Sequence, residues 1–153
     1  MELTPDRLKD IYRTMWRIRL FEEEANRQAA FGNVQGAFHM YCGEEAVATG
    51  FCAHLRTDDY VVGTHRSHGH YIAKGGSIDR MMAELFGREE GVCKGKGGSM
   101  HVADFWVGML GANGIVGGGF APATGAALGP NASAYRGAAA GVAQYRRRAR
   151  RMK

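Results

Sequence analysis

The sequence predicts a layered α/β domain. Apolar residues at helical spacing alternate with one short run of β-branched residues, in the order helix, helix, strand, helix, helix. Hydrophobic residues make up 45% of the 153-residue chain and charged residues 23%, a globular balance that excludes a wholly disordered chain. No apolar run approaches the roughly 18 residues that a membrane span requires. The chain is therefore expected to fold around a buried core and to bind no membrane.

The N-terminal segment is expected to form a long helix from Thr4 to about residue 30. Thr4 is a suitable N-cap and Pro5 suits the first helical position. Apolar residues then recur at helical spacing, at Leu8, Ile11, Tyr12, Met15 and Ile18. The remaining charged residues, Arg13, Arg17 and Arg27 with Glu22, Glu23 and Glu24, predict a solvated face with salt bridges.

Four further helices and one strand follow. The second helix begins near Glu44 and is expected to bury Ala46, Val47, Gly50, Phe51 and Leu55. A short strand is predicted over residues 60–62 because two of its residues are β-branched. The later helices are predicted over residues 68–74, over 77–87 with Ser77 as N-cap and Gly87 as the stop, and over 121–128.

Glycine is concentrated in one region of the chain. Of the 23 glycines, 11 lie between Gly87 and Gly119, where regular patterns fade. We expect loops there, with backbone approaching a ligand or another chain. The segment 95–99 (GKGGS) does not match the spacing of a phosphate-binding loop, so the nucleoside-triphosphatase interpretation is weak.

Charge divides the chain into two parts. Residues 1–129 carry 13 basic and 15 acidic side chains, a net charge of −2, whereas residues 130–153 carry 7 basic and no acidic side chains, a net charge of +7. We expect a folded body over 1–129 and a solvated, disordered basic tail over 130–153. The body offers no basic face, so nucleic-acid binding is not expected. Three cysteines without a CxxC pair are typical of a reducing, cytoplasmic compartment.

A polar cluster follows the predicted strand directly. The run Thr64–His70 (THRSHGH) lies where ligands bind in open α/β sheets, and Arg66 is suited to clamp an anionic group. The alternative is that these histidines cap a helix and form local hydrogen bonds. A zinc site of His65, His68, His70 and Cys93 has no supporting ligand spacing. His39, between Phe38 and Met40, is by its neighbours a core histidine.

Six ordered motifs carry a resemblance to a known family. They are MWRIRLFEE (15–23), FHMYCGEEAVA (38–48), DDYVVGTHRSHGH (58–70), MAELFG (82–87), GKGGSMH (95–101) and MLGANGIVGGG (109–119). From about Tyr12 to Gly129 the chain resembles the N-terminal third of the alpha subunit of thiamine-diphosphate-dependent 2-oxoacid dehydrogenases. THRSHGH and MLGANGIVGGG are most similar to the acetoin dehydrogenase branch, followed by pyruvate dehydrogenase.

The resemblance implies a fold, a cofactor and partners. The fold would be part of a three-layer thiamine-diphosphate-binding α/β fold with a parallel sheet and an N-terminal helical segment. The family reaction is oxidation of an oxo group, in acetoin or a pyruvate-type 2-oxoacid, with transfer to lipoamide. The cofactors would be thiamine diphosphate and magnesium. The partners would be a beta subunit, in a heterotetramer, and a lipoyl acyltransferase.

The resemblance also assigns roles to six residues. Arg66 matches the arginine that contacts the diphosphate, and His65 occupies a neighbouring cofactor-binding position that is often tyrosine. The backbone of Gly114 and Val116 matches the contacts to the aminopyrimidine ring. His39 matches a histidine near the substrate, and His68 lies near the same site; both are expected to be catalytic.

The chain departs from the family after Gly129. The GDG…N motif, whose aspartate and asparagine ligate magnesium, is absent from the sequence, so no metal ligand is assigned. The tail 130–153 is interpreted as out of frame on a truncated gene. An alternative function is thus an inactive gene fragment or a subunit-interaction module. In either case Val61, Ile72, Phe105 and Trp106 are expected to contact water or another chain.

Overall fold

The computed structural model describes residues 3–128 and has five α-helices and two strands in that range. In chain order they are α1 (Pro5–Ala30), α2 (Glu45–Cys52), β1 (Val61–Thr64), α3 (His68–Ala73), α4 (Ile78–Leu85), β2 (Met109–Asn113) and α5 (Phe120–Leu128), with 3₁₀ turns η1 (Gly98–Met100) and η2 (Phe105–Val107) before β2. The basic tail predicted over 130–153 lies outside the described residues. None of the helices described is long and apolar enough to cross a bilayer.

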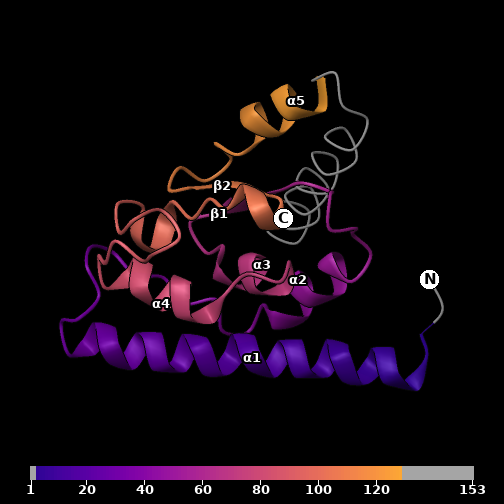
Figure 1. The fold of residues 1–153 in the computed structure, drawn as a ribbon, viewed down its shortest axis with the longest axis horizontal. Helices are drawn as coiled ribbons and strands as arrows, with labels where there is room; N and C mark the ends of the chain where they lie inside the picture. The colour runs from indigo at the N-terminus through magenta and orange to yellow at the C-terminus, as the bar shows by residue number, and fades with distance from the viewer. Residues whose placement is uncertain (1–2, 129–153) are drawn as a thin grey trace, which may run out of the picture.

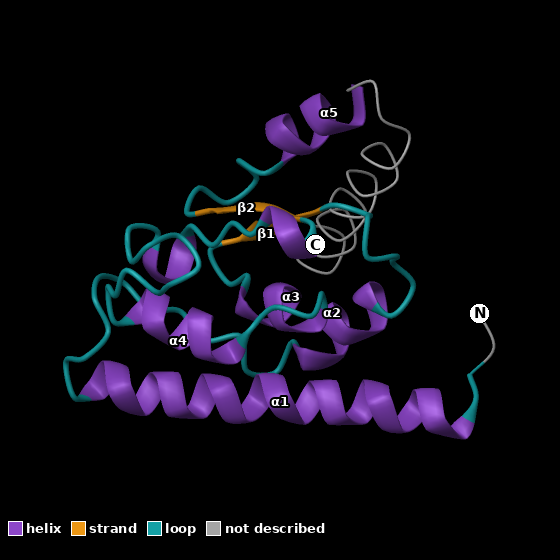
Figure 2. Ribbon diagram, viewed as in Figure 1, coloured by secondary structure: helices purple, strands orange, loops and turns teal. Residues whose placement is uncertain are grey.

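The elements form layers around a small parallel sheet, which confirms the predicted α/β class. β1 and β2 pair in parallel, with Val61 opposite Met109 and Thr64 opposite Asn113. Figure 1 shows α1 along one side of the molecule, α2, α3 and α4 between it and the strands, and α5 beyond the strands on the other side. The long loops connect these layers (Figure 2).

Each face of the sheet has its own apolar core. The larger core joins α1, α3, α4 and the strands through Ile18, Phe21, Tyr71, Ile72, Met81, Leu85 and Met109, among others. A smaller one joins Val62 of β1 to Ala123 of α5, with Leu110, Ala126 and Ala127 packed against it. Burial of these side chains supplies the main stabilisation of the layers.

Helix α1 begins and ends where the sequence predicts. The Thr4 hydroxyl accepts a hydrogen bond from the backbone N–H of Arg7 at 3.4 Å, and the proline occupies the first turn. The prediction of a solvated acidic run was wrong at one position: Glu22 is completely buried, whereas Glu24 lies at the surface and pairs with Arg27. Glu22 turns inward because the buried N–H of Tyr41 and the buried His68 ring both donate to its carboxylate.

Helix α2 exposes part of the face that was predicted to be buried. Ala48, Thr49 and Cys52 are buried, whereas Ala46 and Val47 are exposed. The cause is Glu45, whose carboxylate accepts hydrogen bonds from Arg19 Nε at 2.7 Å and from the Gly43 backbone, and so fixes the rotation of the helix. Burial opposes ionisation of Glu45, but these hydrogen bonds outweigh it and the pKa of Glu45 is lowered.

The structure confirms the remaining helices and adds a strand. Helices α3, α4 and α5 lie within one or two residues of their predicted bounds, and the Ser77 hydroxyl caps α4 by accepting from Arg80 N at 3.3 Å. The prediction of a loop over 111–117 was wrong at its start, because residues 111–113 belong to β2. Its glycine and alanine carry little β preference, so the strand exists through its pairing with β1.

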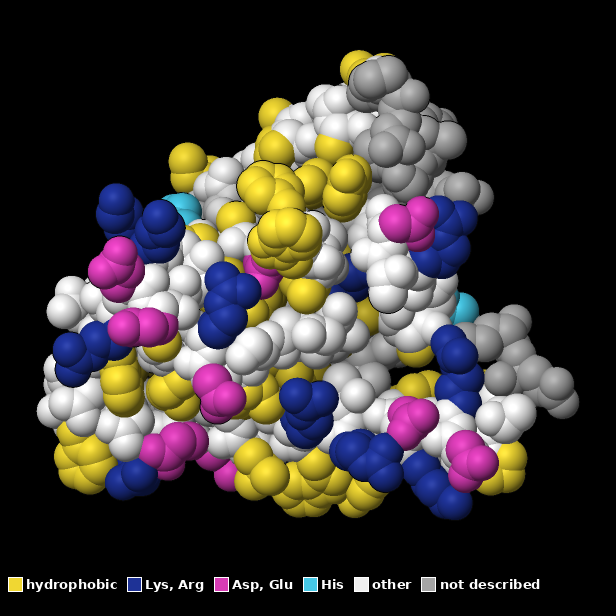
Figure 3. All heavy atoms as spheres, viewed as in Figure 1, with side chains coloured by type: hydrophobic (Ala, Val, Ile, Leu, Met, Phe, Trp, Pro, Cys, Tyr) yellow, Lys and Arg dark blue, Asp and Glu magenta, His cyan; other side chains and the backbone are white. Residues whose placement is uncertain are grey.

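Exposure of apolar residues follows the prediction in part. Phe105 and Trp106 on η2 are 71% and 92% exposed, as expected, but Val61 and Ile72 are buried in the larger core. The two-stranded sheet therefore covers more apolar surface than the sequence indicated. Figure 3 shows hydrophobic side chains gathered where η2 lies and along the outer side of α1, whose exposed residues include Leu8, Tyr12, Trp16 and Leu20.

Candidate functional site

The two strands end side by side and bring together the predicted cofactor residues. Thr64 is the last residue of β1 and pairs with Asn113, the last residue of β2. His65 and Arg66 follow β1 directly, and Gly114 and Val116 follow β2. In parallel sheets the carboxyl ends of the strands are where ligands bind. Two segments almost fifty residues apart in sequence thus converge on one edge of the sheet.

His39 joins this edge from the loop between α1 and α2. Its exposed ring meets the ring of His65 edge to face, with 5.2 Å between centroids and an interplanar angle of 89°. Next to it, the Met40 carbonyl accepts a hydrogen bond from the Arg66 guanidinium. The sequence interpretation of His39 as a core histidine was wrong, since the ring lies at the surface. We call His39, His65, Arg66, Gly114 and Val116 the strand-end cluster.

The local backbone fixes the arrangement of the cluster. The backbone N–H of Arg66 donates to the Thr64 hydroxyl at 3.1 Å, which turns the chain sharply after β1. On the other strand, the Asn113 side chain accepts from the backbone N–H of Ile115 at 2.9 Å. Val116 is 71% exposed after that turn. Both strand ends therefore close with a side-chain-to-backbone turn and leave the following residues accessible.

His68 lies apart from the cluster, in the interior. Its ring is fully buried, is stacked on Phe38 at 5.4 Å between centroids, and has both nitrogens occupied. Nδ1 lies 2.7 Å from Glu22 Oε1, while Nε2 lies 2.9 Å from Ser99 Oγ and 3.1 Å from the Ser99 carbonyl. A carboxylate only accepts, so Nδ1 carries a proton. In this structure His68 connects α1, α3 and η1 and has no surface toward a ligand.

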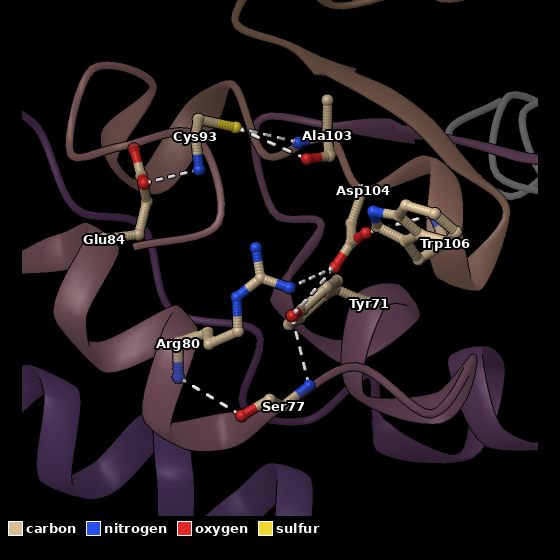
Figure 4. Close-up of polar contacts among 8 residues, drawn as sticks. All are labelled: Tyr71, Ser77, Arg80, Glu84, Cys93, Ala103, Asp104 and Trp106. Carbon is tan, nitrogen blue, oxygen red and sulfur yellow. Dashed lines mark hydrogen bonds and ion pairs between the residues drawn. The ribbon is translucent and has the colours of Figure 1, made fainter. Parts of the chain in front are cut away.

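The glycine-rich loop is built around an internal carboxylate. Glu84, buried on α4, accepts from four backbone N–H groups, those of Cys93, Gly95, Gly97 and Gly98, at 2.7–3.0 Å. One of these contacts is drawn in Figure 4. Such inward N–H groups form an anion nest, and here the protein's own carboxylate fills it. These four N–H groups already donate to Glu84, so they are not available to bind a phosphate.

The same loop delivers a residue that sequence reasoning missed. His101 follows η1, is exposed, and has its Nε2 3.6 Å from the position that a Cβ on Gly114 would take. It therefore adds a third imidazole beside the strand-end cluster. The only sequence signal for it was its place at the end of the GKGGSMH motif, to which no role was attached.

Asp104 fixes the approach to β2. Its Oδ1 accepts from the Trp106 backbone at 3.1 Å, and its Oδ2 accepts from the Tyr71 hydroxyl and Arg80, each at 3.4 Å (Figure 4). Burial, and then the nearby Asp104 carboxylate, raise the pKa of Tyr71 to about 12. Backbone bonds in both directions between Asp104 and Met109 close the turn. The beginning of β2 is thus anchored to α3 and α4.

The chemistry of the cluster suits an anionic, flat ligand. The guanidinium and two imidazoles of the cluster, with the His101 imidazole beside them, can contact phosphate oxygens, and a glycine allows backbone to approach a planar ring. Within residues 3–128 no group of three or more His, Cys, Asp or Glu side chains is placed to hold a metal ion. The four residues of the zinc alternative do not converge, since His68 contacts Ser99 and Cys93 contacts Ala103.

Comparisons with known proteins identify relatives of this chain. Residues 13–144 match the family model described as dehydrogenase E1 component. The chain is 56% identical over 128 residues to the alpha subunit of acetoin:2,6-dichlorophenolindophenol oxidoreductase of Bacillus subtilis, and 46% identical over 137 residues to that of Cupriavidus necator. It is 44% identical over 126 residues to the pyruvate dehydrogenase E1 alpha subunit of Rhizobium meliloti.

These matches cover most of this chain but only part of each relative. They span 84%, 90% and 82% of the chain, and 38%, 40% and 35% of the respective relatives. The chain therefore spans less than half the length of these relatives. The family match continues to residue 144, which is 15 residues beyond the boundary predicted at 129.

Proposed function

The chain belongs to the dehydrogenase E1 component family, and we propose that it is the N-terminal part of the alpha subunit of a thiamine-diphosphate-dependent dehydrogenase. The reaction would be oxidation of acetoin or a pyruvate-type 2-oxoacid, with transfer to lipoamide. The observation that carries the proposal is the convergence of His65 and Arg66 with Gly114 and Val116 at the ends of two paired strands.

The residues of the cluster fit the cofactor in two places. The Arg66 guanidinium and the His65 imidazole would bind the diphosphate, and the backbone at Gly114 and Val116 would lie along the aminopyrimidine ring. Thiamine diphosphate, when bound, supplies the electron sink for cleaving a bond next to a carbonyl. His39, exposed beside His65, would orient the substrate and hold a proton at its ring.

Magnesium would join the cofactor through ligands that this sequence does not contain. The GDG…N motif is absent from it, and residues 3–128 form no group of three or more His, Cys, Asp or Glu side chains for a metal. The proposed partners are a beta subunit, in a heterotetramer, and a lipoyl acyltransferase. The cysteine pattern supports a cytoplasmic location.

A second function is favoured by the exposed aromatic residues. Phe105 and Trp106 present an exposed apolar surface on η2, where Asp104 accepts a hydrogen bond from the Trp106 backbone. Aromatic residues of this kind anchor protein interfaces. In this second function the chain would serve as a subunit-interaction module without turnover.

Titration of the ¹⁵N-labelled chain with thiamine diphosphate, with and without magnesium, tests the first function. We expect weak binding without magnesium dependence, and chemical-shift changes confined to the strand-end cluster. Arg66→Gln should abolish these changes. Arg13→Gln, which alters an exposed arginine on α1 paired with Asp10, is the matched control.

The possible outcomes separate the two functions. Absence of shift changes at His65, Arg66 and Gly114 would contradict the cofactor site and leave the interaction module. Micromolar, magnesium-dependent binding would instead show that the missing motif does not limit the chain. Changes that persist in Arg66→Gln would place the cofactor elsewhere.

A further inference from the structure

Glu22 is a buried charged residue to which the proposed function assigns no role. It lies on α1 with no exposed surface. Its Oε2 accepts from the backbone N–H of Tyr41 at 2.9 Å, and its Oε1 accepts from His68 Nδ1 at 2.7 Å. A buried carboxylate is costly unless it is well bonded. Here both of its oxygens have a buried donor.

The first donor leads directly to the strand-end cluster. Tyr41 follows His39 and Met40, so the bond to Glu22 anchors the end of that segment. The Met40 carbonyl accepts from Arg66, and the His39 ring packs against His65. The Tyr41 ring packs directly against the backbone of Gly69, so closely that a Cβ on Gly69 would lie 2.4 Å from it. The ring therefore has no room to move toward α3. Holding the Tyr41 backbone therefore also holds the positions of His39 and Arg66.

The second donor leads to the other side of the site. His68 Nε2 contacts the hydroxyl and the carbonyl of Ser99, which is buried in η1. Two residues later, His101 lies beside Gly114 at the end of β2. One carboxylate thus connects, through His68, to the loop that carries His101.

We propose that Glu22 is a positioning residue of the candidate site, which sets His39 and Arg66 through Tyr41 and sets His101 through His68. This deepens the proposed function and relies on it for the identity of the ligand. The carboxylate is needed because both neighbours donate. An amide in its place has a single acceptor oxygen, so it cannot accept from both the Tyr41 N–H and the His68 Nδ1–H.

Glu22→Gln tests the proposal because it preserves the volume of the side chain and removes the second acceptor. The measurements are amide hydrogen exchange of Tyr41 and the imidazole signals of His39 and His101, on the full chain labelled with ¹⁵N. We expect exchange of the Tyr41 amide to accelerate about tenfold or more, the effect of losing one hydrogen bond to a charged group. The His39 and His101 signals should shift, although neither ring contacts Glu22.

Glu23→Gln is the matched control. Glu23 is the next residue on α1, its side chain is 57% exposed, and it only approaches Arg19 at 3.9 Å. Glu23→Gln should leave the hydrogen exchange of the Tyr41 amide and the imidazole signals of His39 and His101 unchanged. A role of Glu22 in packing alone predicts that Glu22→Gln behaves like the wild type in all three readouts, and that result would overturn the proposal.

Measurements on the wild-type chain keep the proposal testable if Glu22→Gln does not fold. The Nδ1 proton of His68 and the Tyr41 amide should both be protected from exchange. Either one exchanging like a surface group would refute the proposal. If thiamine diphosphate produces no shifts in the wild type, the proposed cofactor site fails, whereas the exchange data still decide the role of Glu22.

Discussion

The carboxylate of Glu84 accepts a hydrogen bond from the backbone N–H of Gly97, 2.7 Å away and thirteen residues later in the chain. Three more N–H groups of the same loop share this carboxylate. The loop therefore wraps around an anion that belongs to α4. Its conformation therefore depends on that carboxylate.

Replacing Glu84 by glutamine should destabilise the chain by about 3 kcal/mol, since an amide cannot accept four N–H bonds and its NH₂ group would face donors. Urea unfolding followed by circular dichroism measures the free energy of unfolding. Glu89→Gln, at an exposed position after α4, is the control and should change it little. Equal stability of the two variants would show that the loop does not need the carboxylate.

Replacing Gly108 by alanine should lower the stability of the chain, whereas replacing Gly50 by alanine should raise it. Gly108 has φ +75°, and a Cβ there would lie 2.4 Å from the Asp59 carbonyl, so Gly108→Ala should cost about 2 kcal/mol or more. Gly50 lies within α2 with open space around its Cα, so Gly50→Ala should stabilise by about 0.5–1 kcal/mol. Thermal melts of the two variants compare them directly, and the same sign for both would contradict the structure.

Cys52 should be the last cysteine to react with a thiol reagent. Burial raises the pKa of Cys52 to about 12, and burial also raises the pKa of Cys42 and of Cys93, both of which are less buried. The thiolate is the reactive form. Mass spectrometry after timed iodoacetamide labelling at pH 8 should find Cys52 unmodified until denaturant is added, and labelling as fast as that of Cys93 would be inconsistent with its burial.

The raised pKa of Cys52 also predicts how stability changes in alkali. The unfolded chain loses this proton near the ordinary value of 9.0, whereas the folded chain keeps it to about 12. The buried, protonated thiol therefore makes its full contribution to the free energy of unfolding below pH 9.0, and this contribution is lost as the pH rises toward 12. Cys52→Ser unfolding curves across this range should lack that part of the decline.

The purified chain should self-associate at tens of micromolar, because exposed apolar patches drive association. Trp106, 92% exposed, contacts little of its own chain. Trp106→Lys should lower the weight-average mass in sedimentation velocity while leaving the far-ultraviolet circular dichroism unchanged. A monomeric wild type with a cooperative melt would show that the exposed aromatics are harmless.

The sequence was sufficient to predict the helices because their signals are local. Thr4 and Ser77 both cap as predicted. Of the apolar residues at helical spacing in α1, Ile18 is buried, whereas Leu8 and Tyr12 are exposed. The motif residues after β1 and β2 could also be named in advance. That they share one edge of the sheet depends on the pairing of Thr64 with Asn113, which no local pattern encodes.

Two features escaped prediction because their partners are distant in sequence. Glu22 stands beside two other glutamates and looks like surface, yet its partner His68 lies 46 residues away. β2 contains glycine and alanine where a strand usually has β-branched residues, and it forms only against β1. Both cases show tertiary contacts outweighing local propensity.

The parallel pairing of β1 with β2 has a consequence for the order in which the chain folds. Val61 and Met109 meet across a 48-residue separation, and closing so long a segment costs entropy before the pair gains any bond. The helices α1 and α4 form from neighbouring residues and pay no such cost. We infer that the sheet assembles late, after the individual helices have begun to form. The edge that carries Arg66 and Gly114 would then exist only once folding is almost complete, so a chain arrested early would have its helices but no ligand site.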